Sequence, residues 1–119
     1  MSTQKFTLRE LEKHTGQGEN KRIFLGLNGN VYDVSGGAAF YGPGKGYSVF
    51  AGCDCTIGLA RSSLLRKDMP YPGEAPTAMD SLSEEEKKTA LAWEARLKLK
   101  YPVVGVLVKE DESEPEPER

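Results

Sequence analysis

Residues 32–52, YDVSGGAAFYGPGKGYSVFAG, are the stretch from which the fold of this chain is best inferred. The stretch joins the end of an expected strand to a glycine-rich loop that carries Tyr41 and Tyr47. Because glycine allows a close approach of the backbone, such a loop can border a ligand pocket. The apolar residues 49–51 follow, so a phenol oxygen can lie at the mouth of that pocket, and phenolate is a known iron ligand. On spacing alone, packing with the hydroxyl bonded to a backbone carbonyl is the commoner role of such tyrosines.

A hairpin is predicted immediately before this stretch. Residues 22–27 are rich in Ile, Phe and Leu, which indicates a strand. Asn28 and Gly29 follow, and this dipeptide is the strongest short signal for a tight hairpin turn. Residues 30–34 are then expected to return as the partner strand.

Two capping boxes predict where helices begin. Thr7 and Glu10 open a short helix that runs to about residue 14, and Ser83 and Glu86 open the longest helix, which runs to about residue 100. In each box the serine or threonine accepts a backbone N–H while the glutamate reaches back to the cap. One face of the longer helix carries three apolar residues expected to pack in the core: Ala90, Trp93 and Leu97.

The remaining elements are inferred from shorter patterns. Short helices are expected over residues 47–51 and 55–65, the second with the apolar positions Ile57, Leu59, Ala60 and Leu64. The three prolines of residues 69–77 predict an irregular loop. After Pro102, the β-branched run 103–108 predicts a further strand.

Length and charge indicate one small globular domain, residues 1–109, followed by an acidic tail, residues 110–119. The chain has 119 residues, of which 38% are hydrophobic and 29% charged. The tail carries a net charge of −5, leaving +3 for the rest, and a Glu-Pro repeat without apolar residues is expected to be disordered. It is either a solvated tail or a segment that docks on a basic partner.

Several functional classes find no support in the sequence. It lacks a basic cluster with interleaved aromatics, a phosphate-binding glycine motif and a G-x-S-x-G nucleophile turn, so nucleic-acid binding and hydrolysis are disfavoured. No apolar run reaches the ~20 residues needed to span a bilayer. Cys53 and Cys55 predict two small, reduced side chains on a cytosolic helix, with a redox-sensitive thiol near the pocket as the alternative. The single histidine, His14, is expected at the surface.

Four blocks of sequence together resemble a known family. In order they are FTLREL, FLGLNGNVYDVS, FYGPGKGYSVFAGCD and LAWEARLKLKYPVVG. This order resembles the cytochrome b5-like haem and steroid-binding domain of the membrane-associated progesterone receptor family, over roughly residues 5–107. The resemblance implies an α+β fold, with a small mixed sheet and short helices that form a haem pocket. The HPGG signature and second histidine of electron-carrying cytochrome b5 are absent, which opposes bis-histidine electron transfer.

The same resemblance implies a set of binding residues. Tyr47 falls at the axial ligand of ferric haem b, and Tyr41, Lys100 and Tyr101 fall around the same pocket. An anionic oxygen ligand would favour ferric over ferrous iron. Three other residues have less specific expectations: Tyr32 and Trp93 are typical of the core, and Asp54 is as suited to capping the next helix as to touching a ligand.

The implied function is that of a non-catalytic haem-binding protein. By resemblance its partners are cytochrome P-450 monooxygenases, within sterol metabolism or haem handling, and an exposed haem face predicts haem-dependent self-association. The alternative is a haem-free steroid or lipid-binding module that uses the same pocket, including Phe40, Val49 and Phe50. The expected location is the cytoplasm or the cytosolic face of the endoplasmic reticulum.

Overall fold

A four-stranded mixed sheet forms the centre of the computed structural model, which describes residues 4–17 and 21–110. The strand order is β1-β4-β3-β2, with β1 parallel to β4 and the other two pairs antiparallel. The strands are β1 (Gln4–Phe6), β2 (Phe24–Leu27), β3 (Asn30–Asp33) and β4 (Val103–Leu107). The predicted α+β fold, a small mixed sheet with short helices, is confirmed.

The predicted hairpin is present and its turn has the expected backbone. Asn28 and Gly29 have φ angles of 53° and 84°, as a two-residue hairpin turn requires at both positions. Leu27 then pairs with Asn30. The first strand begins two residues later than predicted, because Ile23 pairs instead with Thr15 in an isolated bridge.

Strand β1 was not predicted from the sequence. It has only three residues, too few for alternation to be visible, and it forms because Gln4 pairs with Gly105 of β4 from the far end of the chain. A Cβ at Gly105 would lie 2.6 Å from the ring of Phe6. Glycine at this position therefore allows the two strands to approach.

The helices are short except for the last. They are α1 (Leu8–Leu11), α2 (Ala38–Tyr41), α3 (Thr56–Ala60) and α4 (Glu84–Lys100). Both predicted capping boxes, at Thr7 and at Ser83, are formed in full. Single 3-10 turns complete the chain: Ser35–Gly37, Ser48–Phe50, Arg66–Asp68 and Met79–Ser81.

Three predicted helices are shorter than expected. The helix that follows Thr7 ends at Leu11, whereas the sequence predicted an end near residue 14. Residues 47–51 form only the 3-10 turn Ser48–Phe50. The helix predicted over 55–65 ends at Ala60, because Ser62 adopts a left-handed φ of 55° and Ser63 donates its N–H to the Gly58 carbonyl at 2.7 Å. Leu64, predicted on the buried helix face, is consequently 52% exposed in the following loop.

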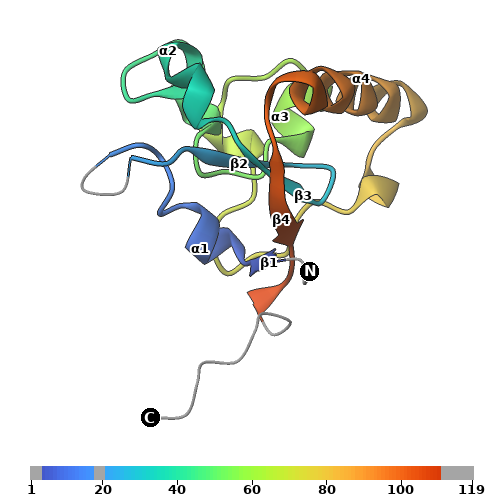
Figure 1. Ribbon diagram of the computed structural model, residues 1–119. Coiled ribbons are helices and arrows are strands. Elements are labelled where there is room, and N and C mark those ends of the chain that lie inside the picture. Colours follow the sequence, from blue (N-terminus) through green and yellow to red (C-terminus); the bar gives the residue numbers. More distant parts are fainter. Residues whose placement is uncertain (1–3, 18–20, 111–119) are drawn as a thin grey trace.

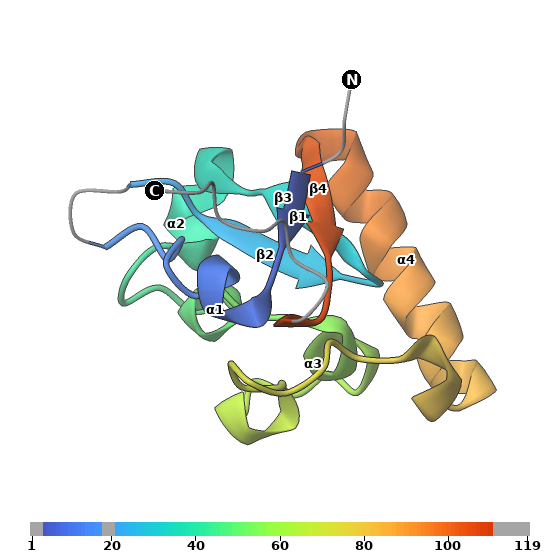
Figure 2. The same ribbon diagram turned by 90° about the horizontal axis from the view of Figure 1, so that it is seen from below.

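The sheet has apolar side chains packed on both faces. Helix α1 lies on one face, where Leu8 and Leu11 pack with Val31 and Leu107. Helices α3 and α4 lie on the opposite face, over the larger core (Figure 1). In the view from below, α1 lies in front of the strands (Figure 2). The larger core includes Leu25, Leu27, Tyr32, Phe50 and Leu97.

The segment after Tyr47 is attached to the sheet by backbone hydrogen bonds. Gly52 donates its N–H to the Phe24 carbonyl at 2.7 Å, and Gly26 donates its N–H to the Cys53 carbonyl at 2.8 Å. The backbone N–H of Cys55 then donates to the Gly26 carbonyl at 2.7 Å. The glycine-rich loop is thus held against β2 at its C-terminal end, which fixes where Tyr47 lies.

The expected acidic tail begins within the described part of the chain. Glu110 accepts a hydrogen bond from Arg9 at 3.1 Å, so this first tail residue is paired with α1. Residues 111–119 lie outside the described residues. Over residues 4–17 and 21–110, no helix combines the length and apolar character needed to cross a bilayer.

Candidate functional site

A closed loop brings Tyr41 and Tyr47 together. Tyr41 is the last residue of α2, and Tyr47 donates its backbone N–H to the Phe40 carbonyl at 2.9 Å. The residues between them, GPGKG, turn the chain back over this short distance. The two phenol rings consequently lie 6.2 Å apart between centroids.

The end of α4 adds a third tyrosine to this pair. Tyr101 directly follows α4 and donates its N–H to the Leu97 carbonyl at 2.8 Å. Its ring meets Tyr41 edge-on, with centroids 6.3 Å apart and planes at 80°, a favourable arrangement for aromatic rings. Tyr41 therefore lies between Tyr47 and Tyr101, which come from segments more than 50 residues apart.

Two adjacent hollows open beside the three rings, and both are lined by Tyr41, Tyr47 and Trp93. The first, of about 250 Å³, is formed with α3 and the loop that follows it. The second, of about 210 Å³, lies against the last turns of α4. The first adds Phe50, Leu59, Leu64, Ser62, Ser63 and Gly58. The second adds Phe40, Arg96, Leu97, Lys100 and Tyr101.

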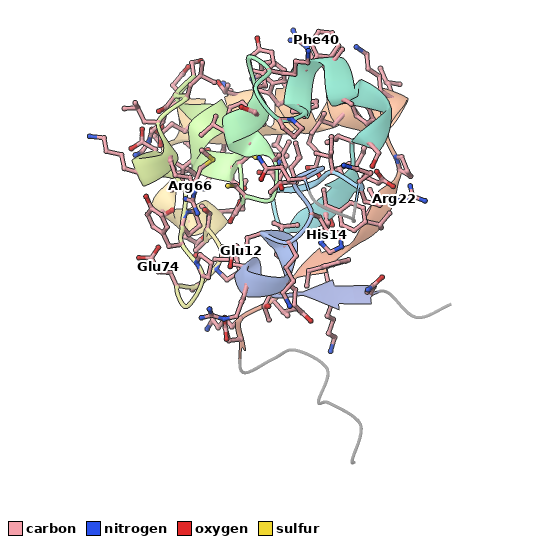
Figure 3. All side chains as sticks on the ribbon, turned by 90° about the vertical axis from the view of Figure 1, so that its left-hand side faces the viewer. Glu12, His14, Arg22, Phe40, Arg66 and Glu74 are labelled. Atoms are coloured by element: carbon pink, nitrogen blue, oxygen red, sulfur yellow. The ribbon has the colours of Figure 1, made fainter. Side chains whose placement is uncertain are left out.

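The accessible groups of this site are aromatic and polar. Tyr47 is 43% exposed, so its phenol is reachable from solvent. Phe40 projects at the outer edge of α2, well away from His14 and Arg22 (Figure 3). Apolar rings beside an accessible oxygen are suited to a flat aromatic or steroidal ligand.

Tyr41 is less exposed than Tyr47, and its burial affects its own acid–base behaviour. Burial, with smaller contributions from Tyr101, Cys55 and Tyr47, raises the pKa of Tyr41 to about 12. Tyr41 therefore remains a neutral hydrogen-bond donor at physiological pH. This supports a division between an exposed phenol, Tyr47, and a protonated neighbour.

The four residues predicted for the pocket lie together. Tyr41 and Tyr47 border both hollows, and Lys100 and Tyr101 border the second. Trp93, predicted as core, is half-buried and lines both hollows, because it lies at the edge of the buried face of α4. The pocket residues Phe50 and Phe40 line the first and second hollow respectively.

Other residues singled out from the sequence lie outside the hollows. Tyr32 is fully buried, as predicted. Asp54 is also buried and accepts hydrogen bonds from the Thr56 N–H at 3.2 Å and the Thr77 N–H at 2.8 Å. Asp54 therefore links the start of α3 to the loop at Thr77, but it is not the helix cap, because the N-cap residue of α3 is Cys55. Val49, predicted to serve the pocket, packs against the core instead.

His14 and the two cysteines contribute no accessible group to the hollows. His14 is half-buried and stacks on Phe24 with ring centroids 4.3 Å apart, rather than lying free at the surface. Cys53 and Cys55 are buried, and burial raises the pKa of both thiols. Both residues lie before α3, so the predicted helical position is wrong. Neither thiol is therefore a reactive thiolate at neutral pH.

The sequence interpretation missed Arg96 and the two serines of the first hollow. Arg96 lies with its guanidinium carbon 5.1 Å from the centroid of the Trp93 ring. A signal was available for this part of the site, because Trp93, Arg96, Leu97 and Lys100 follow the i, i+3, i+4, i+7 spacing of one helix face. No sequence signal marked Ser62 and Ser63, because their position depends on the early end of α3.

Comparison with known proteins gives the family. Residues 7–108 match the profile of the family described as "Cytochrome b5-like Heme/Steroid binding domain". The chain belongs to this family. A hypothetical protein from Arabidopsis thaliana, described as having a cytochrome b5-like fold, superposes on the chain with a TM-score of 0.78 and 36% identity. The alignment covers 90% of this chain and 93% of the Arabidopsis structure.

Curated relatives carry names of the membrane-associated progesterone receptor family and of steroid-binding proteins. The chain is 37% identical to "Probable steroid-binding protein 3" of Arabidopsis thaliana, over 87% of this chain and 97% of that protein. It is 36% identical to human "Membrane-associated progesterone receptor component 2", over 94% of this chain. It is also 36% identical to "Cytochrome P450 regulator dap1" of Schizosaccharomyces pombe, over 91% of this chain.

The chain matches different shares of these relatives. It spans nearly all of the Arabidopsis protein, but 48% of the human protein and 65% of the yeast protein. The two larger relatives therefore contain sequence that this chain does not match. The resemblance to the progesterone receptor family and the cytochrome b5-like fold, both predicted from the sequence, are confirmed.

Proposed function

We propose that this cytochrome b5-like domain binds ferric haem b and that Tyr47 is its axial ligand. The observation that carries the proposal is the exposed Tyr47 phenol at the mouth of two aromatic hollows. Family membership adds that the domain type binds haem or steroid. Tyr41, Lys100 and Tyr101 are the proposed supporting residues.

The residues of the site are compatible with the group. Phe50 and Trp93 offer apolar surfaces for a porphyrin, and Tyr47 offers an oxygen donor, which is an established type of axial haem ligand. Tyr41, Lys100 and Tyr101 line the second hollow with Tyr47, where their hydroxyl and ammonium groups would hydrogen-bond the bound group. Because both hollows are small and open, a large part of a bound porphyrin would remain accessible to solvent.

The site is better suited to binding than to catalysis. A haem bound through an anionic oxygen would supply a low-potential ferric centre. Among the described residues that line the two hollows there is no carboxylate, histidine or thiol to act as a general base or nucleophile. We therefore propose a non-catalytic role, with Tyr47 holding the ligand and Tyr41 held protonated beside it.

A steroid or lipid ligand without haem is the second candidate. The first hollow favours it, because Phe50, Leu59 and Leu64 are apolar while Ser62 and Ser63 offer hydroxyl groups to a sterol oxygen. The Arabidopsis relative is named a steroid-binding protein. Both ligands would occupy the same surface and would compete.

The names of the relatives and the open site support a proposal about partners and location. The yeast relative is named a cytochrome P450 regulator, and we propose that this chain also supports P-450 monooxygenases, at the cytosolic face of the endoplasmic reticulum or in the cytoplasm. Exposed Phe40 and Leu64 beside a partly accessible porphyrin make an apolar surface. Haem-dependent self-association is expected to cover it.

Hemin titration tests the proposal. The purified chain should bind one equivalent of hemin, with a shifted Soret band and a brown colour, and should retain haem when isolated from haem-replete cells. A steroid such as progesterone should displace it if both use the same hollows. A colourless protein that binds progesterone but leaves the spectrum of free hemin unchanged would reject the haem proposal in favour of the second candidate.

A further inference from the structure

Two cations lie at one end of the second hollow without an acidic partner. Arg96 and Lys100 are one helical turn apart on α4, and both line the hollow beside Tyr101. Like charges at this spacing destabilise a helix. Among the described residues neither cation takes part in an ion pair; the four pairs present are Arg9–Glu110, Arg22–Asp33, Arg61–Glu86 and Lys87–Glu84.

Arg96 is exposed, and its guanidinium lies over the Trp93 ring. Its guanidinium carbon lies 5.1 Å from the centroid of the Trp93 ring, within the range of a cation–π contact. When a planar guanidinium stacks on an aromatic ring, its N–H groups point outward in the guanidinium plane and remain free to donate hydrogen bonds to a ligand. That geometry matches a carboxylate or sulfate with two hydrogen bonds.

The opposite end of the site carries no charge. There the first hollow is bordered by Gly58, Ser62, Ser63 and Leu64. The two hollows share Tyr41, Tyr47 and Trp93, so one flat ligand can extend from the neutral end to the cationic end. A ligand with an apolar body and an anionic group would gain most with its anionic group toward α4.

We propose that Arg96 binds an anionic group at the edge of the ligand and orients the ligand in the hollows. The site then selects flat apolar molecules that carry a carboxylate or sulfate over neutral molecules with the same body. The anionic group is either a haem propionate or the acidic group of a steroid conjugate. The inference rests on the proposed function, since it concerns the same ligand.

The test compares charged and neutral forms of each ligand on the full chain. The probes are hemin against haem dimethyl ester, followed by absorbance, and pregnenolone sulfate against pregnenolone, followed by quenching of Trp93, the single tryptophan. The variant is Arg96→Gln. The matched control is Lys98→Gln, which removes the same charge from the same helix at a residue that borders neither hollow.

We expect Arg96→Gln to weaken binding of the anionic form by about 10-fold or more, the usual effect of losing a charge-assisted hydrogen bond, and to leave binding of the neutral form unchanged. Lys98→Gln should change neither. Arg96→Lys should restore part of the selectivity, because the charge returns without the fork. If the effect appears with hemin and its dimethyl ester, the anionic group is a haem propionate. If it appears with pregnenolone sulfate and pregnenolone, the anionic group is that of a steroid conjugate.

Equal weakening of the charged and neutral forms would overturn the inference, because Arg96 would then act only by packing on Trp93. The same holds if Arg96→Gln has no effect on either form. If the wild-type chain ignores hemin but binds pregnenolone sulfate through Arg96, the haem proposal fails and the inference stands. If it binds none of the four probes, both fail.

Discussion

The phenol of Tyr32 donates a hydrogen bond of 2.5 Å to the Glu94 carboxylate, which joins strand β3 to helix α4 in the protein interior. Asn28 and Asn30 also donate to this carboxylate, at 2.9 and 2.7 Å. Burial, followed by the neighbouring carboxylate, raises the pKa of Tyr32, so it remains a donor. Glu94 thereby attaches the hairpin to the helix that carries Trp93.

Glu94→Gln should destabilise the fold in a pH-dependent way. An amide cannot accept all three hydrogen bonds, and loss of charge-assisted bonds in a buried group costs about 1–3 kcal/mol. Burial alone would raise the pKa of Glu94, but the hydrogen bonds from Tyr32, Asn28 and Asn30 lower it overall. The unfolded state therefore binds the proton more readily, so the stabilisation is complete above the ordinary glutamate pKa of ~4.3 and is lost as the pH falls through the lowered value.

Urea unfolding at pH 7 and at pH 3 measures this effect. The difference in unfolding free energy between wild type and Glu94→Gln should be large at pH 7 and small at pH 3. Glu85→Gln, an exposed change on the same helix, should show little difference at either pH. If Glu94→Gln lowers the unfolding free energy by the same amount at pH 7 and at pH 3, the ionised carboxylate does not stabilise the fold.

Gly37→Ala should disturb the tyrosine cluster, whereas Gly36→Ala should not. A Cβ at Gly37 would overlap the Tyr101 hydroxyl and lie 3.3 Å from Cδ2 of Tyr41, while a Cβ at Gly36 meets nothing within 4 Å. Overpacking of this kind costs about 1–3 kcal/mol. Thermal unfolding of the two variants gives the comparison.

The double variant Gly37→Ala/Tyr101→Phe identifies the atom responsible. Because the closest contact is with the Tyr101 hydroxyl, its removal should recover part of the stability lost in Gly37→Ala. Equal melting temperatures for the Gly36 and Gly37 variants would show that Tyr101 does not lie against Gly37.

Tyr41→Phe should reduce the loss of stability at high pH. The pKa of Tyr41 is raised to about 12, while an unfolded tyrosine titrates near ~10. The stabilisation is therefore complete below pH ~10 and is lost as the pH rises through about 12. Urea unfolding between pH 9 and 11 should show a shallower decline for Tyr41→Phe than for wild type. Parallel curves would argue against a buried, protonated Tyr41.

Local chemistry in the sequence predicts much of this fold. The capping boxes at Thr7 and Ser83 and the turn at Asn28–Gly29 depend on neighbouring residues, and all three are present. Strand β1 depends on a partner about 100 residues away, so its three residues carry no recognisable pattern. The length of α3 depends on the left-handed Ser62, a conformation that serine rarely adopts.

The site was predictable to a smaller extent. The glycine loop indicates that Tyr41 and Tyr47 can approach each other, because few residues separate them. That Tyr101 packs against Tyr41 depends on where α4 crosses the sheet, and only family resemblance suggested it. Trp93 was predicted as core from its helix face, but it lies at the boundary of that face, where a pattern does not separate core from pocket lining.

The most direct test of tyrosine ligation is the absorption spectrum of the hemin complex of Tyr47→Phe, with Tyr71→Phe as the control. Tyr71 is 47% exposed in the proline-rich loop and borders neither hollow. Wild type and Tyr71→Phe should show the same Soret and phenolate-to-iron charge-transfer bands. Tyr47→Phe should lose the charge-transfer band and bind hemin at least about 10-fold more weakly, a difference of ~1.4 kcal/mol. Unchanged bands and affinity in Tyr47→Phe would contradict tyrosine ligation.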